Sequence, residues 1–288
     1  MNRRWSQPGA ETYTPDGQDL DVALDKITHL AVGAHQDDLE IMAIHGILEC
    51  FNHAERSFSG VVVTSGQGSA RSGKYAAFSD QLMAATRKEE QRAAARLGRY
   101  GSLLQLDFES AHIKQATGQK ELVSDLCSLL SGVKPDVLYT HSLFDAHATH
   151  VATSWAVVAA LRLLPAERVP RQVVGCEVWQ DLDWLPQAHK IIMDVSAEAE
   201  LQVQLLAQFQ SQISGGKRYD LAALGRRRAH ATFSDSHHVD HSSGLVYGMD
   251  LLPLVRDPLL KPGEYLAFLI KQFEEQSLGR LSALFPPE

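Results

Sequence analysis

The sequence predicts an α/β fold, namely a Rossmann-like, doubly wound, mostly parallel sheet with a smaller irregular C-terminal part. Between residues 27 and 210, short apolar runs alternate with longer segments whose apolar residues recur every three or four positions. This alternation is typical of right-handed βαβ units, in which helices cover both faces of a parallel sheet. The 288 residues are 44% hydrophobic and 22% charged, a composition that allows a sizeable buried core.

The predicted elements follow one another in a regular order. Short runs of apolar and β-branched residues predict strands at residues 27–34, 60–64, 102–106, 136–140, 173–178 and 190–195. Apolar residues three or four positions apart predict helices at residues 40–53, 79–97, 121–131, 149–164 and 197–210.

No linker or internal repeat divides the chain. Residues 1–22 are rich in Pro, Gly, Asp and Thr, so we expect a flexible N-terminal arm there and a single domain over residues 23–288. Residues 212–250 show weak periodicity, and we expect the part from about residue 212 to form a pocket wall or lid. The Gly-Arg-Arg-Arg stretch at residues 225–228 is expected to be a solvated helix end.

Charge and composition argue against several classes of partner. The formal net charge of −8 gives no electrostatic reason to expect DNA, RNA or an anionic membrane as a partner. No apolar run reaches the roughly 18 residues that a membrane helix requires, and the N-terminus lacks the apolar core of a signal peptide. Cys50, Cys127 and Cys176 stand alone in apolar surroundings, so we expect reduced cysteines in a cytoplasmic protein.

Ionisable residues follow the first predicted strand, at the edge where open parallel sheets bind ligands. His35, Asp37 and Asp38 leave this strand just before its helix begins. His35 and Asp38 are three residues apart, so a tight turn or a first helical turn can direct both side chains to one point. Two side chains of this segment can therefore bind a metal while the third stays free.

A second group of ionisable residues follows the fourth predicted strand. Asp145, His147 and His150 lie within residues 140–150 and precede or open the next helix. His147 and His150 repeat the three-residue spacing. Because both groups come after strands of the same sheet, we expect them to lie at the same edge.

These residue types indicate a metal-dependent hydrolase. Two histidines and one carboxylate form a ligand set of catalytic zinc sites, with the fourth position left to water. Zinc lowers the pKa of that water to about 7, so a nearby carboxylate can accept its proton at neutral pH. The spare Asp37 fits this role, and His147 is suited to act as an acid or an electrophile.

The same residues resemble the motifs of the LmbE-like, or PIG-L, family of zinc-dependent N-acetyl-sugar deacetylases. The family's Ala-His-Pro-Asp-Asp-Glu is similar to Ala-His-Gln-Asp-Asp-Leu-Glu at residues 34–40, and its His-Pro-Asp-His is similar to His-Ala-Thr-His at residues 147–150. Residues 65–75 and the Arg-x-x-Glu helix at 86–98 extend the likeness along the N-terminal two-thirds of the chain.

The resemblance implies an LmbE-like fold and assigns roles to individual residues. It implies that His35, Asp38 and His150 bind one Zn²⁺ per chain, with another divalent metal left open. It also implies that Asp37 is the general base acting on metal-bound water. His147 would polarise the carbonyl or protonate the leaving amine. Arg87 would bind sugar hydroxyls.

Several positions depart from the family pattern. Gln36 replaces Pro, Leu39 replaces the first Glu although Glu40 remains, and His45 stands where many relatives have Gly. Thr149 replaces an Asp that orients the acid histidine. This last change is expected to lower the pKa of His147, unless Asp145 supplies the missing carboxylate.

Three further residues are candidates for substrate binding. Arg71 follows the Gly66-x-Gly68 loop, which we expect to line the sugar pocket. Asp145 stands beside the second motif. His238 belongs to a histidine cluster at residues 234–241, for which a lid or pocket wall is the expectation and a second metal site the alternative.

We therefore expect a zinc-dependent hydrolase that removes the N-acetyl group from a small amino sugar, such as an N-acetylglucosamine derivative, or from a glycoconjugate. Two alternatives stay open. One is an amidase acting on a larger N-acyl group or a thiol-sugar conjugate, and the other is a catalytically degenerate protein that binds metal or sugar. Assembly into a homo-oligomer is also left open.

Overall fold

The centre of the molecule is a sheet of eight strands within residues 5–285, the part of the chain that the computed structural model describes. The strand order is β1-β4-β3-β2-β5-β6-β8-β7, and the five strands from β4 to β6 are parallel. β1, β8 and β7 run antiparallel to their neighbours. The strands are β1 (Glu11–Tyr13), β2 (His29–Gly33), β3 (Phe58–Thr64), β4 (Ser102–Phe108), β5 (Val137–His141), β6 (Gln172–Cys176), β7 (Lys190–Asp194) and β8 (Leu245–Asp250). The predicted fold class is confirmed.

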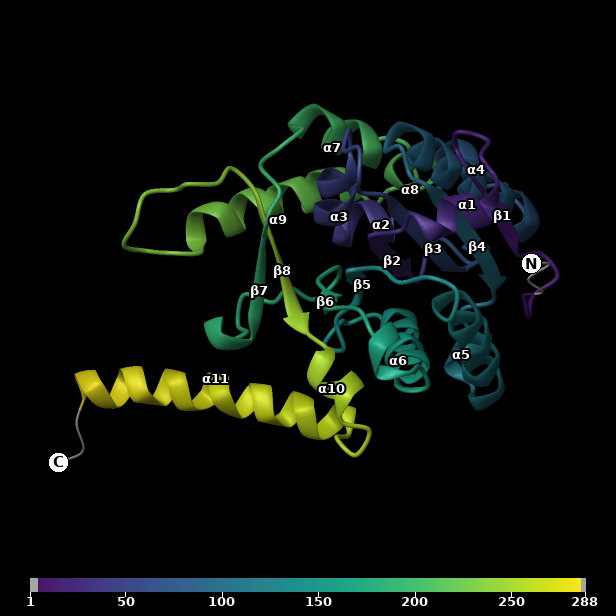
Figure 1. Cartoon of the computed structure of the whole chain (residues 1–288). Coiled ribbons are helices and arrows are strands. Elements are labelled where there is room, and N and C mark those ends of the chain that lie inside the picture. Colours follow the sequence, from purple (N-terminus) through teal and green to yellow (C-terminus); the bar gives the residue numbers. More distant parts are fainter. Residues whose placement is uncertain (1–4, 286–288) are drawn as a thin grey trace.

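Helices cover both faces of the sheet (Figure 1). Successive residues of a strand point to opposite faces, so Leu30 and Val32 of β2 enter one core and Ala31 enters the other. The first core is covered by α5 (Ala116–Leu130), α6 (Ala148–Arg162) and α10 (Leu252–Arg256). The second is covered by α2 (Asp38–Met42), α3 (Ile44–Cys50), α4 (Asp80–Leu97) and α7 (Ala199–Leu206).

The remaining helices lie around these layers. They are α1 (Leu20–Asp25), α8 (Gln210–Ile213), α9 (Tyr219–Phe233) and α11 (Pro262–Leu284), together with short 3₁₀ turns η1 (Gly73–Tyr75), η2 (His112–Lys114), η3 (Ala166–Arg168) and η4 (Gln187–His189). Among the described residues, no helix combines the length and the apolar character required to cross a bilayer.

The N-terminal segment differs from the predicted flexible arm. Its strand β1 pairs with β4, with Thr12 opposite Leu104, and the Ser6 hydroxyl donates a hydrogen bond to Asp125 at 2.8 Å. The prediction is therefore wrong for the described part of the arm, and residues 1–4 lie outside the described residues. β1 is held by pairing at the sheet edge and by polar contacts, and it buries little apolar surface. The sequence therefore lacks the apolar run that would predict a strand there.

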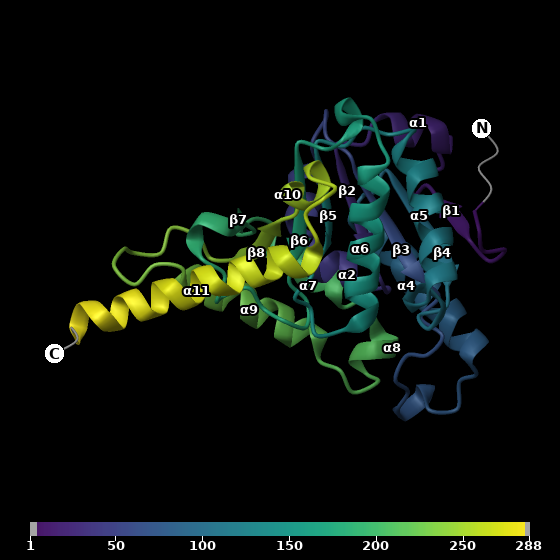
Figure 2. The same ribbon diagram turned by 90° about the horizontal axis from the view of Figure 1, so that it is seen from below.

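The C-terminal part is more regular than its weak periodicity suggested. α9 spans 15 residues of the segment expected to be irregular, and α11 spans 23. Arg227 and His230 of α9 are buried, and these polar residues on the inner face conceal the helical pattern in the sequence. α11 extends away from the rest of the molecule (Figure 2), and only its residues Tyr265 and Leu269 are buried.

Candidate active site

The loop after β2 holds its backbone in an uncommon conformation. Asp37 has a φ angle of 88°, in the left-handed region that few residues other than Gly adopt and that Asp tolerates better than most. The Asp37 N–H donates to Oε1 of Gln91 at 3.1 Å, and the His35 N–H donates to Oδ2 of Asp38 at 2.6 Å. Backbone strain of this kind is typical of functional sites.

A buried polar network supports this loop from behind. Gln91 of α4 donates to Oε1 of Glu40 at 2.8 Å, and the Tyr100 hydroxyl donates to the same oxygen at 2.6 Å. Burial raises the pKa of Glu40 to about 8, although both hydrogen bonds oppose the shift. The Glu40 carboxyl therefore anchors α2 to Gln91 and Tyr100.

The segment between β5 and α6 carries the second group. His147 is the N-cap residue of α6, and His150 lies in the first turn of that helix. Oδ1 of Asp145 accepts the His147 N–H at 2.8 Å and lies 3.2 Å from Nδ1 of His150. Asp145 therefore holds the start of α6 and places a carboxylate oxygen beside the ring of His150.

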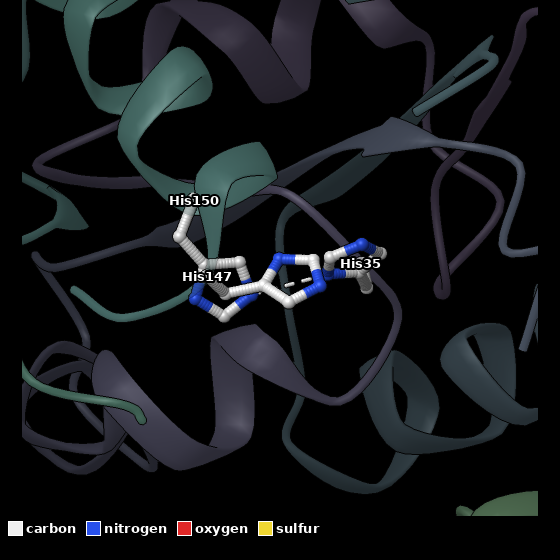
Figure 3. Close-up of side chains that lie close together, drawn as sticks. All are labelled: His35, His147 and His150. Atoms are coloured by element: carbon white, nitrogen blue, oxygen red, sulfur yellow. Dashed lines mark hydrogen bonds between the residues drawn. The ribbon is translucent and has the colours of Figure 1, made fainter. Parts of the chain in front are cut away.

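The three predicted metal ligands lie close together. Among the described residues, the groups able to hold a metal are His35 with His147 and His150, and Asp38 with His141 and His150. Nδ1 of His35 lies 3.1 Å from Nε2 of His150, Oδ2 of Asp38 lies 3.3 Å from Nδ1 of His35, and Oδ1 of Asp38 lies 3.5 Å from Nε2 of His150. Ligand atoms about 2.1 Å from a tetrahedral ion are roughly 3.4 Å apart, so these spacings fit a metal of that coordination. Figure 3 shows His35 and His150 approaching each other, with His147 close by. Burial raises the pKa of Asp38, but the nearby His150 and His141 outweigh it and hold this pKa well below its usual range.

The sequence analysis did not identify His141, although its position at the end of a predicted strand was a usable signal. It is the last residue of β5. It is buried, its ring stacks on His150 with centroids 3.8 Å apart, and its Nε2 lies 3.3 Å from Asp38. Burial lowers the pKa of His141 to about 4, with a further contribution from His150. Its Nε2 accepts the Ala34 N–H at 2.9 Å. Because this bond occupies the single lone pair of Nε2, His141 supports the site and His35 remains the better ligand.

Asp37 stands beside this ligand set without joining it. Its carboxylate is buried, and its Oδ2 lies 3.1 Å from Nη2 of Arg87. Burial raises the pKa of Asp37 to about 7, against the opposing charge of Arg87, and the negative charge of Asp38 adds to the rise. Near neutral pH, the carboxyl is thus balanced between its two protonation states, as a general base should be.

Arg87, predicted to bind sugar hydroxyls, is largely engaged within the protein. Its guanidinium donates to the backbone oxygen of Gln36 and to the Ser69 hydroxyl as well as pairing with Asp37. Gly66 makes this packing possible, since a Cβ there would lie 3.0 Å from Cδ of Arg87 and the residue has a φ of 71°. Arg87 lines the cavity, but its contacts identify it first as the residue that holds Asp37.

His147 has lost the carboxylate that the family pattern would supply. Thr149 is buried, and Nδ1 of His147 has no hydrogen-bond partner among the described residues. Asp145 binds the backbone N–H of His147 and lies beside the ring of His150, so it does not replace the missing Asp. Burial lowers the pKa of His147, and the neighbouring His150 lowers it further.

The site opens into a cavity of about 320 Å³, within the size range of small-molecule sites. The sequence had indicated the inner lining residues but missed two aromatic residues, Trp179 and Tyr219. The Trp179 ring lies nearly parallel to His147, with centroids 6.4 Å apart, and perpendicular to Tyr219 at 6.0 Å. Trp179 directly follows the predicted strand at 173–178, which was the only signal for it. The lining also includes Ser110, Lys114 and Gln212.

Two predicted substrate-binding residues are not brought to this cavity. Arg71 follows the lining residue Ala70 but is itself not part of the lining, and it donates hydrogen bonds to Asp80 and to the backbone oxygen of Gln67 at 2.5 Å. His238 is exposed, pairs with Asp235 at 2.8 Å and borders a separate surface depression. The histidine cluster contributes no residue to the metal-ligand groups found among the described residues.

Comparison with known proteins connects this geometry to a family. Residues 30–161 match the family model PIG-L, described as GlcNAc-PI de-N-acetylase. These residues form a PIG-L domain. The resemblance noted from the sequence is confirmed, and the PIG-L domain contains both motifs, from β2 to α6. Trp179 and Tyr219 lie outside it.

Solved structures resemble the PIG-L domain together with much of the rest of the chain. The conserved protein TT1542 from Thermus thermophilus has a TM-score of 0.60 at 18% identity, over 82% of this chain and 99% of that one. GalB, a 4-carboxy-2-hydroxymuconate hydratase from Pseudomonas putida, has a TM-score of 0.60 at 18% identity, over 78% and 95%. The N,N'-diacetylchitobiose deacetylase from Pyrococcus horikoshii has a TM-score of 0.57 at 16% identity, over 81% and 88%. At these identities the likeness establishes the fold alone. No curated protein sequence matches the chain.

Proposed function

We propose that this protein is a metal-dependent deacetylase that hydrolyses the N-acetyl group of an amino sugar or of a small sugar conjugate. The observation that carries the proposal is the close approach of His35, Asp38 and His150 to one another beside the buried Asp37. The PIG-L match and the fold shared with a diacetylchitobiose deacetylase support the same reaction class.

The donor atoms fit Zn²⁺, since two imidazole nitrogens and one carboxylate oxygen form a set that zinc uses in catalytic sites. Other divalent metals accept the same donors. When bound, such an ion supplies Lewis-acid polarisation of an amide carbonyl and makes water more acidic.

The remaining steps belong to side chains of this protein. Asp37 accepts a proton from the attacking water, and Arg87 holds its carboxylate in place. His147, with its lowered pKa, is neutral at pH 7 and donates an N–H to the oxygen that gains charge in the transition state. The proton held by Asp37 then passes to the amide nitrogen, so that the C–N bond breaks and acetate and a free amine leave.

The aromatic residues at the mouth of the cavity support a sugar as the amine component. Trp179 is 45% exposed although its ring borders the cavity, and Tyr219 stands perpendicular to it. A pyranose ring has an apolar C–H face that packs on such a surface. We therefore place the sugar against Trp179 and the acetyl group at the inner end.

One observation favours a second candidate function. Nδ1 of His147 has no partner among the described residues, so its ring lacks the carboxylate that would fix its tautomer. A protein that binds metal and sugar without turning the sugar over is therefore the second candidate.

The test combines metal analysis with product detection. We expect about one divalent metal per chain, and release of acetate from at least one member of a panel of N-acetylated amino sugars and their glycosides. His150→Ala should lose both metal and activity. A metal-free wild-type protein would overturn the metal site. Metal and sugar binding without hydrolysis would establish the second candidate, and release of a longer acid from N-acylated sugars would identify an amidase for larger acyl groups.

We also propose that the protein is cytoplasmic and that residues 23–288 form one domain. The three cysteines form no disulfide, which supports a reducing compartment. One continuous sheet contains strands from both the N-terminal and the C-terminal parts, which supports the single domain.

A further inference from the structure

Three consecutive residues after β6 are each held by a different contact. Glu177 is buried and accepts hydrogen bonds from His230 at 2.7 Å and from the backbone N–H of Leu182 at 3.0 Å. The backbone oxygen of Val178 accepts from Nη1 of Arg226 at 2.6 Å. The backbone N–H of Trp179 donates to Oδ2 of Asp145 at 3.0 Å.

The last of these contacts leads directly to the candidate metal site. The Asp145 carboxylate is held at both oxygens. Oδ2 accepts the Trp179 N–H, while Oδ1 accepts the His147 N–H at 2.8 Å and lies 3.2 Å from Nδ1 of His150. A carboxylate fixed at one oxygen presents the other at a defined place. The Trp179 backbone therefore contributes to the position of the carboxylate beside the His150 ring.

Helix α9 supplies the contacts that hold Glu177 and Val178. Arg226 and His230 are four residues apart and lie on the same side of the helix. The sequence suggested that the Gly-Arg-Arg-Arg stretch at residues 225–228 forms a solvated helix end, and the structure contradicts this for Arg226 and Arg227. Arg227 is buried and donates to the backbone oxygens of Glu40 at 2.7 Å and Ile41 at 3.2 Å, within α2.

One helix therefore contacts both segments that carry the site. Arg227 reaches α2, whose first residues include Asp38, while Arg226 and His230 reach the segment that binds Asp145. Arg228 is the exception, since it is exposed and makes no hydrogen bond or ion pair within residues 5–285. Arg226, Arg227 and His230 thus bind backbone oxygens and a buried carboxylate. A cluster of charges that serves only solubility would not make such contacts.

We propose that Arg226 and His230 are positioning residues, which fix residues 177–179 so that the Trp179 N–H holds Asp145 and Asp145 orients His150. The proposal rests on the proposed function for the role of His150 as a metal ligand. Neither Arg226 nor His230 lines the cavity, so both act through the residues that they hold.

The test compares Arg226→Ala with Arg228→Ala, two variants of one helix that lose the same charge. We expect the Kd for Co²⁺ to rise about tenfold in Arg226→Ala, the lower end of the effect of removing support behind a metal ligand. We expect less than a twofold change in Arg228→Ala. Hydrogen exchange of the peptide containing residues 175–182, measured without metal, should accelerate in Arg226→Ala alone. Arg226→Lys, which keeps a donor for the Val178 oxygen, should recover part of both effects.

Several outcomes separate this proposal from the proposed function. Equal Co²⁺ affinity and equal exchange rates in Arg226→Ala and Arg228→Ala would overturn it. A wild-type protein that binds no Co²⁺ would overturn the metal site, whereas the exchange comparison would still decide whether Arg226 holds residues 177–179. If Arg226→Ala does not fold, His230→Leu provides the comparison, because it removes the side-chain donor to Glu177 and leaves the hydrogen bond from the Leu182 N–H in place. Unchanged exchange and affinity in that folded variant would also count against the proposal.

Discussion

The inner and outer ends of the cavity are built in different ways. At the inner end, His35, Asp38 and His150 come from two short motifs at the ends of β2 and β5, and their side chains are largely buried. At the outer end, Trp179 and Tyr219 come from a loop after β6 and from the start of α9, and Trp179 is 45% exposed.

Under the proposed function, this difference separates the residues that take part in hydrolysis from those that select the substrate. The inner residues all belong to the PIG-L domain at residues 30–161, whereas the aromatic residues lie beyond it. Under the proposed function, substitutions at the outer end should change which molecule binds and leave the proposed metal ligands in place. Variants at the two ends should accordingly fail in different ways, by loss of turnover at the inner end and by loss of affinity at the outer end.

The largest effect is expected from Asp37→Asn at the inner end. Asn tolerates the left-handed conformation of this position, so the loop should keep its shape while the base is lost. We expect kcat to fall by about 10² to 10⁴-fold, the usual contribution of a general base, with metal content unchanged. Steady-state kinetics and metal analysis of the purified variant measure both quantities.

Asp107→Asn provides the matched control. Asp107 also has a positive φ, 63°, but pairs with Lys88 at 2.7 Å outside the cavity. Its variant should keep full turnover. Equal loss of activity in the two variants, or loss of metal in Asp37→Asn, would contradict the assignment of Asp37 as the base.

A smaller effect of a different kind is expected from Trp179→Ala at the outer end. Removing the aromatic face should raise KM about tenfold, equivalent to roughly 1.4 kcal/mol, and leave kcat within a few-fold of the wild-type value. Trp179→Phe should restore most of the affinity. Trp184→Phe is the control, because Trp184 packs on Phe144 and Phe273 away from the cavity. A fall in kcat with unchanged KM in Trp179→Ala would remove the distinction between the two ends.

The smallest effect concerns His29, which lies at the opposite end of β2 from His35. Burial lowers the pKa of His29 to about 4, with a further contribution from His45. The unfolded chain therefore binds a proton at higher pH than the folded protein does. The stability associated with neutral His29 is present above pH ~6.5 and is lost as the pH falls towards 4.

His29→Gln should remove this dependence. Between pH 7 and pH 5, the wild-type free energy of unfolding should fall by about 1–2 kcal/mol more than that of the variant. Urea unfolding at the two pH values measures the difference. Parallel losses in both proteins would show that His29 does not oppose protonation in the folded state.

The comparison of the two ends also explains what the sequence could predict. Sequence reasoning found five residues of the candidate site because each lies in a short motif after a strand with a clear apolar run, and parallel strands bring such motifs to one edge. These residues are His35, Asp37, Asp38, His147 and His150. Most strands and helices before residue 210 were predicted for the same reason, with ends displaced by a few residues.

The missed features depend on contacts between distant segments. Strand β1 has few apolar residues and is held by pairing to β4, and α9 buries Arg227 and His230 where a helical pattern would require apolar residues. Tyr219 reaches the cavity only because α9 packs beside α2 and the segment after β6. His238 illustrates the opposite error, since a cluster of histidines in the sequence proved to be exposed and away from the cavity.

The order of strands in the sheet has a consequence for the time course of folding. β8 lies between β6 and β7, so β6 receives its second neighbour only from residues 245–250. Glu177 likewise gains one of its hydrogen bonds only when β8 is in place, because the backbone N–H of Tyr247 donates to it at 3.2 Å. Contacts between residues so far apart in the sequence are slow to form. During synthesis they can form only after the later of the two segments has left the ribosome. The motifs after β2 and β5 are thus translated before residues 245–250, which complete the pairing of β6 and the support of the segment that follows it.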